Sequence, residues 1–167
     1  MATAPAEAGR AVVLDTNVAL DLLLFHDPRT AELQQALAQG RLRWLVLPRM
    51  REEFARVLDY AHLLAWRQAH GRSAEAALAA FDAQSRTAEA VPACAVRCSD
   101  PDDQPFIDLA AAHRALLLSK DRAVLATRAR LAALGVDVLQ QLLTKRHADA
   151  TPQGVEAGSK LAHFQQM

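Results

Sequence analysis

The sequence contains only two cysteines among its 167 residues, Cys94 and Cys98. Their CxxxC spacing, with no second cluster of Cys or His close by, supports neither a structural zinc site nor a disulfide framework. We therefore expect two buried thiols in a protein of the reducing cytoplasm.

Long hydrophobic runs are also missing, although 51% of the residues are hydrophobic. Nowhere do about 18 apolar residues follow one another, as a membrane-spanning helix requires. The N-terminus lacks the basic stretch and the apolar run of about 7 to 15 residues that mark a secretory signal. We therefore expect an intracellular protein without a membrane partner.

Net charge is absent as well, because nineteen basic residues balance nineteen acidic ones. No global field indicates a polyanionic partner, so any such site must be local. The length suits one buried core and is short for two. We expect one domain at 10–143, after a disordered leader at 1–9 and before a C-terminal tail at 144–167 that has one candidate helix.

Short apolar segments alternate with helical patterns along the chain. The apolar runs predict strands at 11–14, 44–47, 92–97, 115–118 and 136–139. Apolar stripes and terminal signals predict helices at 18–25, 28–39, 49–70, 73–89, 101–113 and 121–134. Because the strands are continuously apolar, the pattern favours an α/β fold in which helices cover both faces of a parallel sheet of about four to five strands.

Asp15 and Asp121 follow two of these predicted strands. Asp15 comes directly after the strand at 11–14, and only Ser119 and Lys120 separate Asp121 from the strand at 115–118. The carboxyl ends of parallel strands share one edge of the sheet, where ligands bind. Both residues also precede helices, so N-capping explains each one singly, whereas a shared metal site explains both.

Glu53 lies in the predicted helix at 49–70, three residues after Met50 and at the margin of the apolar stripe. The adjacent Glu52 shares its face with Arg49. We therefore expect Glu53 to point inward and Glu52 to lie at the surface. The alternative is that Glu53 is merely a solvated side chain at the edge of the stripe.

Asp100, Asp102 and Asp103 stand at the start of the next predicted helix. Asp100 followed by proline is a good helix start, with Asp100 as the N-cap. Asp103 precedes Phe106 by three residues and so shares the buried face of the helix. Because three acids exceed what capping requires, we expect Asp103 to be the inner ligand, supported by Asp100 or Asp102.

Carboxylates that converge in one crevice repel one another and raise each other's proton affinity unless a cation neutralises them. Oxygen ligands without His or Cys favour Mg²⁺ or Mn²⁺ over zinc, and such ions bind phosphate oxygens as well. The pattern therefore predicts metal-assisted hydrolysis of phosphodiester bonds, with one ion or with two.

Four segments, taken in order, resemble the PIN-domain ribonucleases, which include the toxin members of bacterial toxin-antitoxin pairs. They are Val-Val-Leu-Asp-Thr-Asn-Val at 12–18, Glu-Glu-Phe-Ala-Arg-Val-Leu at 52–58, Asp-Pro-Asp-Asp at 100–103 and Leu-Ser-Lys-Asp at 118–121. The resemblance implies a three-layer α/β/α sandwich and an endoribonuclease that depends on Mg²⁺ or Mn²⁺. It also implies four metal-binding catalytic acids, which are Asp15, Glu53, Asp103 and Asp121.

The same resemblance implies supporting roles for Thr16, Asn17 and Ser119, which would orient ligands, water or phosphate. Lys120 stands where many relatives have a small residue or Arg, and it would hold substrate phosphate or simply be exposed. The toxin members further imply an RNA substrate, a cognate antitoxin that fills the acidic crevice, and a homodimer.

Two other functions fit a similar sheet. A phosphatase-like hydrolase would use Asp15 as its nucleophile, but its first strand would then be expected to end in a paired acid such as DxD. A catalytically silent PIN-like module would bind RNA or protein, although the presence of all four acids disfavours it. Arg122, Arg128 and Arg130 suit phosphate contacts or a solvated face, and no aromatic run beside them indicates base stacking.

Overall fold

The computed structural model describes residues 9–143, so the expected tail and all of the expected leader except Gly9 lie outside the described residues. Five parallel strands form one sheet in the order β3-β2-β1-β4-β5. These strands are β1 (Arg10–Leu14), β2 (Leu42–Val46), β3 (Ser85–Thr87), β4 (Leu116–Leu118) and β5 (Asp137–Leu139). The predicted α/β class with a central parallel sheet is confirmed.

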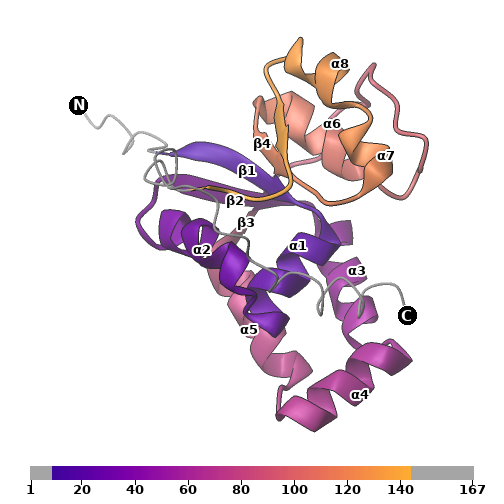
Figure 1. The fold of residues 1–167 in the computed structure, drawn as a ribbon. Coiled ribbons are helices and arrows are strands. Elements are labelled where there is room, and N and C mark those ends of the chain that lie inside the picture. The colour runs from indigo at the N-terminus through magenta and orange to yellow at the C-terminus, as the bar shows by residue number, and fades with distance from the viewer. Residues whose placement is uncertain (1–8, 144–167) are drawn as a thin grey trace, which may run out of the picture.

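Helices cover both faces of this sheet (Figure 1). One layer contains α1 (Thr16–Leu20), α2 (Ala31–Ala38), α3 (Pro48–Leu58) and α5 (Ala74–Gln84), and α4 (Ala61–His70) extends from it. The other layer contains α6 (Gln104–His113), α7 (Arg122–Leu125) and α8 (Arg128–Ala132). The result is the expected three-layer sandwich. Within residues 9–143, no helix combines the length and the apolar character that crossing a bilayer demands.

The central strands are apolar throughout because both of their faces are covered. Val12, Val13 and Leu117 are fully buried. On the α1 side of the sheet, the ring of Phe81 lies 4.7 Å from that of Trp44 and 5.0 Å from that of Phe54, measured between centroids. This core makes the sheet a firm base for the residues at its edge.

The expected helix at 49–70 is in fact two helices, because the chain turns at Asp59 and Tyr60 between α3 and α4. Arg67 is buried at this turn, and its Nε donates a hydrogen bond to the carbonyl of Leu58 at 3.1 Å. That carbonyl belongs to the last turn of α3, where no backbone N–H remains to pair with it. A tertiary contact therefore stabilises a turn that apolar periodicity did not predict.

The edge strand was also predicted in the wrong place. Residues 92–97 form no strand, and β3 lies inside the segment expected to continue the helix at 73–89. The hydroxyl of Ser85 donates to the carbonyl of Phe81 at 2.6 Å, where α5 ends, and Ser85 is already extended. Because β3 is polar and pairs with β2 through its backbone, no apolar run marks it.

Two further helix boundaries differ from the prediction. Helix α6 begins at Gln104 with Asp103 in the N-cap position, whereas Asp100 was expected there. Asp100 instead accepts a hydrogen bond from the backbone N–H of Asp102 at 2.9 Å, which forms a separate turn. The expected helix at 121–134 divides into α7 and α8 at Thr127, whose hydroxyl donates to the carbonyl of Val124 at 2.6 Å.

Strands β1 and β4 lie side by side at the point where the strand order reverses. The chain leaves β1 toward β2 on one side, and β4 pairs with β1 on the other. Leu14 is paired with Leu118, and the N–H of Asp15 donates to the carbonyl of Leu118 at 3.1 Å. The residues that follow both strands therefore meet at a switch point, the usual ligand position in open α/β sheets.

Candidate metal centre

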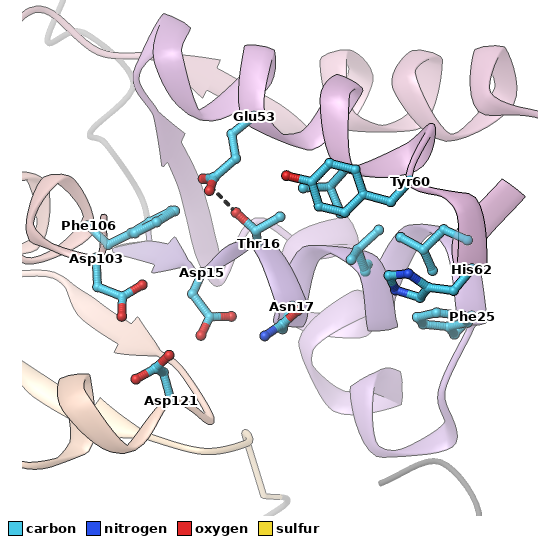
Figure 2. Close-up of a pocket in the computed structure, with 13 residues that line it drawn as sticks. Asp15, Thr16, Asn17, Phe25, Glu53, Tyr60, His62, Asp103, Phe106 and Asp121 are labelled. Atoms are coloured by element: carbon cyan, nitrogen blue, oxygen red, sulfur yellow. Dashed lines mark hydrogen bonds between the residues drawn. The ribbon is translucent and has the colours of Figure 1, made fainter. Parts of the chain in front are cut away.

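A cavity of about 280 Å³ opens at this switch point. All four predicted acids line it: Asp15 after β1, Glu53 on α3, Asp103 before α6 and Asp121 before α7. Figure 2 shows the carboxylates of the three aspartates directed toward one another, with Glu53 across the cavity from them. The fold thus brings together acids that are up to 106 positions apart in the sequence.

Asp15 is buried and makes two different hydrogen bonds. Its Oδ1 accepts from the N–H of Val18 at 2.8 Å, which caps α1, and its Oδ2 accepts from the hydroxyl of Ser119 at 2.5 Å. Burial raises the pKa of this carboxyl, and these two hydrogen bonds and the charge of Lys120 act in the opposite direction. Capping and a place in the cavity are therefore compatible, because only Oδ1 accepts the capping hydrogen bond and Asp15 also lines the cavity.

Ser119 links two of the acids. It is fully buried, donates to Asp15 and accepts a hydrogen bond from the N–H of Asp121 at 3.1 Å. Asp121 in turn caps α7, because its Oδ1 accepts from the N–H of Ala123 at 2.8 Å. One buried hydroxyl therefore sets the distance between the residues that follow β1 and β4.

Asp103 is the acid whose surroundings suit a proton or a cation best. Its Oδ2 is buried and has no hydrogen-bond partner among residues 9–143. Burial, and after it the negative charges of Asp121, Asp100 and Asp15, together raise the pKa of Asp103 to about 7. An unpartnered carboxylate oxygen that faces other carboxylates is what a bound cation would compensate.

Asp100, Asp103 and Asp121 each offer one oxygen, and these oxygens lie within 4.8 Å of one another. Asp100, which the sequence suggested only as a support, thus stands closer to this group than Asp102 does. Asp102 is exposed and lines an adjoining hollow instead of the acidic cavity. A set of three carboxylate oxygens suits a hard divalent cation such as Mg²⁺ or Mn²⁺.

Thr16 and Asn17 lie on the floor of the cavity, at the start of α1. The hydroxyl of Thr16 donates to Oε2 of Glu53 at 2.9 Å, as Figure 2 shows. Glu53 is half-buried and lines the cavity, as predicted from its place on the stripe, and Glu52 is exposed. Asn17 is exposed and lies between Asp15 and the far end of the cavity.

The two predicted phosphate-binding residues do not line the acidic cavity. Lys120 forms an ion pair with Asp21 and lines a separate hollow of about 50 Å³ with Arg29. Arg122 is exposed at the first position of α7. The strand-end position of Lys120 could not reveal this partner, because Asp21 lies about one hundred positions away in the sequence.

Two arginines that the sequence did not single out as substrate contacts lie next to the acidic cavity. Arg49 and Arg56, on α3, line an adjoining hollow of about 330 Å³ that shares Glu53, Tyr60 and Phe106 with the cavity. Neither guanidinium has an ion-pair partner among residues 9–143. Their spacing of seven residues, which keeps two side chains on one face of a helix, is the signal that could have identified them.

Aromatic side chains form the other end of the cavity, and the sequence did not predict them as a group. Phe25, Tyr60 and His62 all line it. Phe25 ends the short π-helix Asp21–Phe25 that follows α1, and the other two come from the corner between α3 and α4. No local sequence pattern could have predicted that these three residues lie together, because the turn between α3 and α4 was not predicted.

Comparison with known proteins agrees with this arrangement. The family model described as PIN domain matches residues 11–123, which is more than half of the chain and includes all four acids. PIN domains are generally nucleases. No curated protein matches the chain. The residues that follow β1 and β4, the acidic cavity between them and the extent of this match all lead to one conclusion: the chain belongs to the PIN domain family.

Proposed function

We propose that this protein is a metal-dependent endoribonuclease that hydrolyses phosphodiester bonds of RNA, with Asp15, Glu53, Asp103 and Asp121 in its active site. One observation supports this most strongly: Asp103 has a buried, unpartnered carboxylate oxygen and lies in a group of three acids whose oxygens are within 4.8 Å. Such a group holds together at neutral pH only if a proton or a cation offsets the repulsion. The family match supports the cation and the nuclease activity.

The residues that would hold Mg²⁺ or Mn²⁺ are Asp100, Asp103 and Asp121, with Asp15 beside them. Glu53, the other predicted ligand, lines the same cavity across from this group. When bound, such a cation supplies Lewis-acid chemistry, in that it polarises a phosphoryl oxygen, favours ionisation of water and stabilises the leaving oxygen. All of the donors are oxygens, and neither His nor Cys stands among these acids.

Other residues of the chain would organise the substrate and the proton transfers. Ser119 keeps the charge of Asp15 next to the acidic group through its hydrogen bond to Oδ2. Thr16 occupies Oε2 of Glu53, which leaves Oε1 without a partner among the described residues and able to accept a proton from attacking water. The exposed amide of Asn17 can donate to a phosphate oxygen or a ribose hydroxyl.

A catalytically silent binding module is the second candidate, because Asp15 and Asp121 both cap helices and would be retained for that reason alone. The group around Asp103 argues against it, since capping explains neither the unpartnered oxygen nor the proximity of Asp100. The phosphatase-like alternative lacks support as well, because β1 is followed by Asp15-Thr16-Asn17 without the paired acid that such an enzyme would be expected to have.

The biological setting follows from the resemblance to toxin members of the family. We propose a cognate antitoxin partner and a homodimer on that basis alone, with residues 10–143 as the folded unit. Cys94 and Cys98 are half-buried and not buried as expected, and their free thiols fit a cytoplasmic location.

The proposed activity is tested by incubating the full chain with single-stranded and structured RNA, in EDTA and with Mg²⁺ or Mn²⁺. We expect cleavage only with the metal. Asp15→Asn and Asp103→Asn should each reduce the rate by about 100-fold or more. Asp137→Asn is the matched control, because this exposed residue begins β5 at the opposite edge of the sheet. Equal rates in all four proteins, or no cleavage by any of them, would favour the binding module.

A further inference from the structure

The acidic cavity has two chemically different ends. The four acids line one end, and the rings of Phe25, Tyr60 and His62 line the other. Figure 2 shows the carboxylates on one side of Asn17 and the three rings on the other. A nucleotide has the same division, because a ribose joins its charged phosphate to a flat base whose π-faces stack on aromatic rings.

Two of the three residues at this end, Tyr60 and His62, are exposed, and Phe25 is half-buried. Tyr60 is 44% exposed and His62 is exposed, whereas Phe54 and Phe106 are buried in the core. Among residues 9–143, Tyr60 is the one aromatic residue in the set of exposed large hydrophobic side chains. Aromatic faces exposed at a cavity offer a ligand more contact area than the fold itself requires.

Packing within the fold supports this end of the cavity without a ligand. Phe25 packs edge-on against Trp66, with ring centroids 4.6 Å apart and planes at 83°. Tyr60 is the N-cap residue of α4, in the corner that the hydrogen bond from Arg67 to Leu58 stabilises. The rings of Tyr60 and His62 lie 6.4 Å apart at 46°. A preorganised surface of this kind loses less entropy when a ligand binds.

We propose that this aromatic end binds one unpaired nucleobase of the RNA, next to the phosphodiester bond at the acidic end. The proposal rests on the proposed nuclease function and assigns the aromatic end of the cavity to the base of the nucleotide whose phosphate lies at the acidic end. Unpaired bases can turn out of the stack of their own strand and stack on Tyr, Phe or His, whereas paired bases in a duplex cannot. Such stacking tolerates any base, because every base has a π-face.

The amide of Asn17 lies where the ribose or the base edge of this nucleotide would be. It carries both donors and an acceptor, so it can bond to the 2′-hydroxyl or to the edge of the base. The aromatic end would therefore select for an unpaired nucleotide, and the acids would act on the phosphate attached to it.

A small probe separates this base site from the nuclease activity. Adenosine 5′-monophosphate has no internucleotide bond to cleave, and ribose 5-phosphate is the same molecule without its base. We expect the full chain in Mg²⁺ to bind the nucleotide about tenfold more tightly than the sugar phosphate, as measured by chemical-shift titration in NMR. Tyr60→Ala should bring this ratio close to one, and Tyr60→Phe, which keeps the ring, should preserve it.

His62→Ala should lower the same ratio, with His113→Ala as its matched control, because His113 is an exposed histidine at the end of α6 and away from the cavity. Cleavage is measured in parallel on single-stranded RNA and on a blunt duplex of the same sequence. Tyr60→Ala should raise KM for the single strand by about tenfold with a much smaller change in kcat.

Equal binding of the two small probes, or a ratio that survives Tyr60→Ala, would overturn the base site even if RNA is cleaved. That outcome would leave the aromatic end as a contact for a protein partner. Absence of RNA cleavage would overturn the proposed nuclease function instead, and the ratio of the two affinities would still decide the base site.

Discussion

Asp103 combines burial with the proximity of two other aspartates, and this combination has a consequence for stability. Its pKa of about 7 lies above the ordinary value of 3.8. Between about pH 4 and 7, the folded protein without metal therefore keeps a proton that the unfolded chain has already released. A state that binds more protons loses relative stability as the pH rises. The raised pKa of Asp15, which its burial causes, acts in the same direction.

We therefore predict that the melting temperature of the protein in EDTA contains a component that falls from about pH 4 to pH 7 and is level above it. Asp103→Asn should remove most of this component, because the amide does not titrate. Thermal melts of both proteins across this range give the comparison. If the two curves have the same slope, Asp103 does not hold the proton.

Ser119 is the second residue whose effect can be isolated. Ser119→Ala leaves Oδ2 of Asp15 without its donor and the N–H of Asp121 without its acceptor. We predict a loss of about 2 to 6 kcal/mol in the free energy of unfolding, since two groups are left unpaired and each costs about 1 to 3 kcal/mol. The cleavage rate should fall as well. Denaturant titration measures the free energy of unfolding, and Ser99→Ala, at an exposed serine, is the control. If Ser119→Ala has the free energy of unfolding of the wild type, the link between Asp15 and Asp121 is dispensable.

The corner between α3 and α4 carries part of the cavity wall, and Arg67 stabilises it. We predict that Arg67→Ala lowers the free energy of unfolding by about 1 to 3 kcal/mol, because the carbonyl of Leu58 loses a buried partner. It should also weaken the preference for adenosine 5′-monophosphate over ribose 5-phosphate, because Tyr60 stands in this corner. Arg72→Ala is the control, because Arg72 is exposed and lies just after the end of α4. It should change neither the free energy of unfolding nor the preference for the nucleotide.

Helix α3 presents Arg49 and Arg56 toward the hollow beside the acids, about 10 Å apart along its axis. The hollow also contains the carboxylates of Glu52 and Asp102, so its charge is mixed. Contact with phosphates should nevertheless be visible in salt dependence, because each contact with a single strand contributes about 0.7 to the slope of log K against log salt.

We therefore predict that replacing both arginines by Gln lowers the salt slope of single-stranded RNA binding by about 1.4, as measured by fluorescence anisotropy in EDTA. Arg51→Gln is the matched control on the same helix, because Arg51 is already paired with Asp82 at 2.7 Å. An unchanged slope in the double variant would place the RNA backbone elsewhere.

The elements of this fold differ in how far they could be predicted. Strands β1 and β4 were predicted well because burial on both faces demands apolar runs. Strand β3 was not, because its polar residues pair through the backbone alone. The corner at Tyr60 depends on Arg67, whose contact with Leu58 periodicity cannot reveal. The four acids were expected together because strand ends and an apolar stripe locate them, whereas the closeness of Asp100 depends on a local turn.

At the scale of the whole molecule, the reversal of strand order between β1 and β4 places residues from distant parts of the chain around one cavity. The family match covers the segment from β1 to the start of α7, which contains every acid of that cavity. The sheet therefore supplies a fixed edge, and the helices on both faces supply the acids and the rings. The central claim is that Asp100, Asp103 and Asp121, with Asp15 beside them, hold the divalent cation on which RNA cleavage depends.

The most direct test compares two titrations with Mn²⁺ on the same protein, one of heat released on binding and one of the rate of single-stranded RNA cleavage. We predict that both saturate at the same Mn²⁺ concentration, and that Asp103→Asn weakens binding and cleavage together while Asp137→Asn changes neither. Cleavage that proceeds in EDTA, or Mn²⁺ binding that Asp103→Asn leaves unchanged, would contradict the assignment of the metal to this cavity.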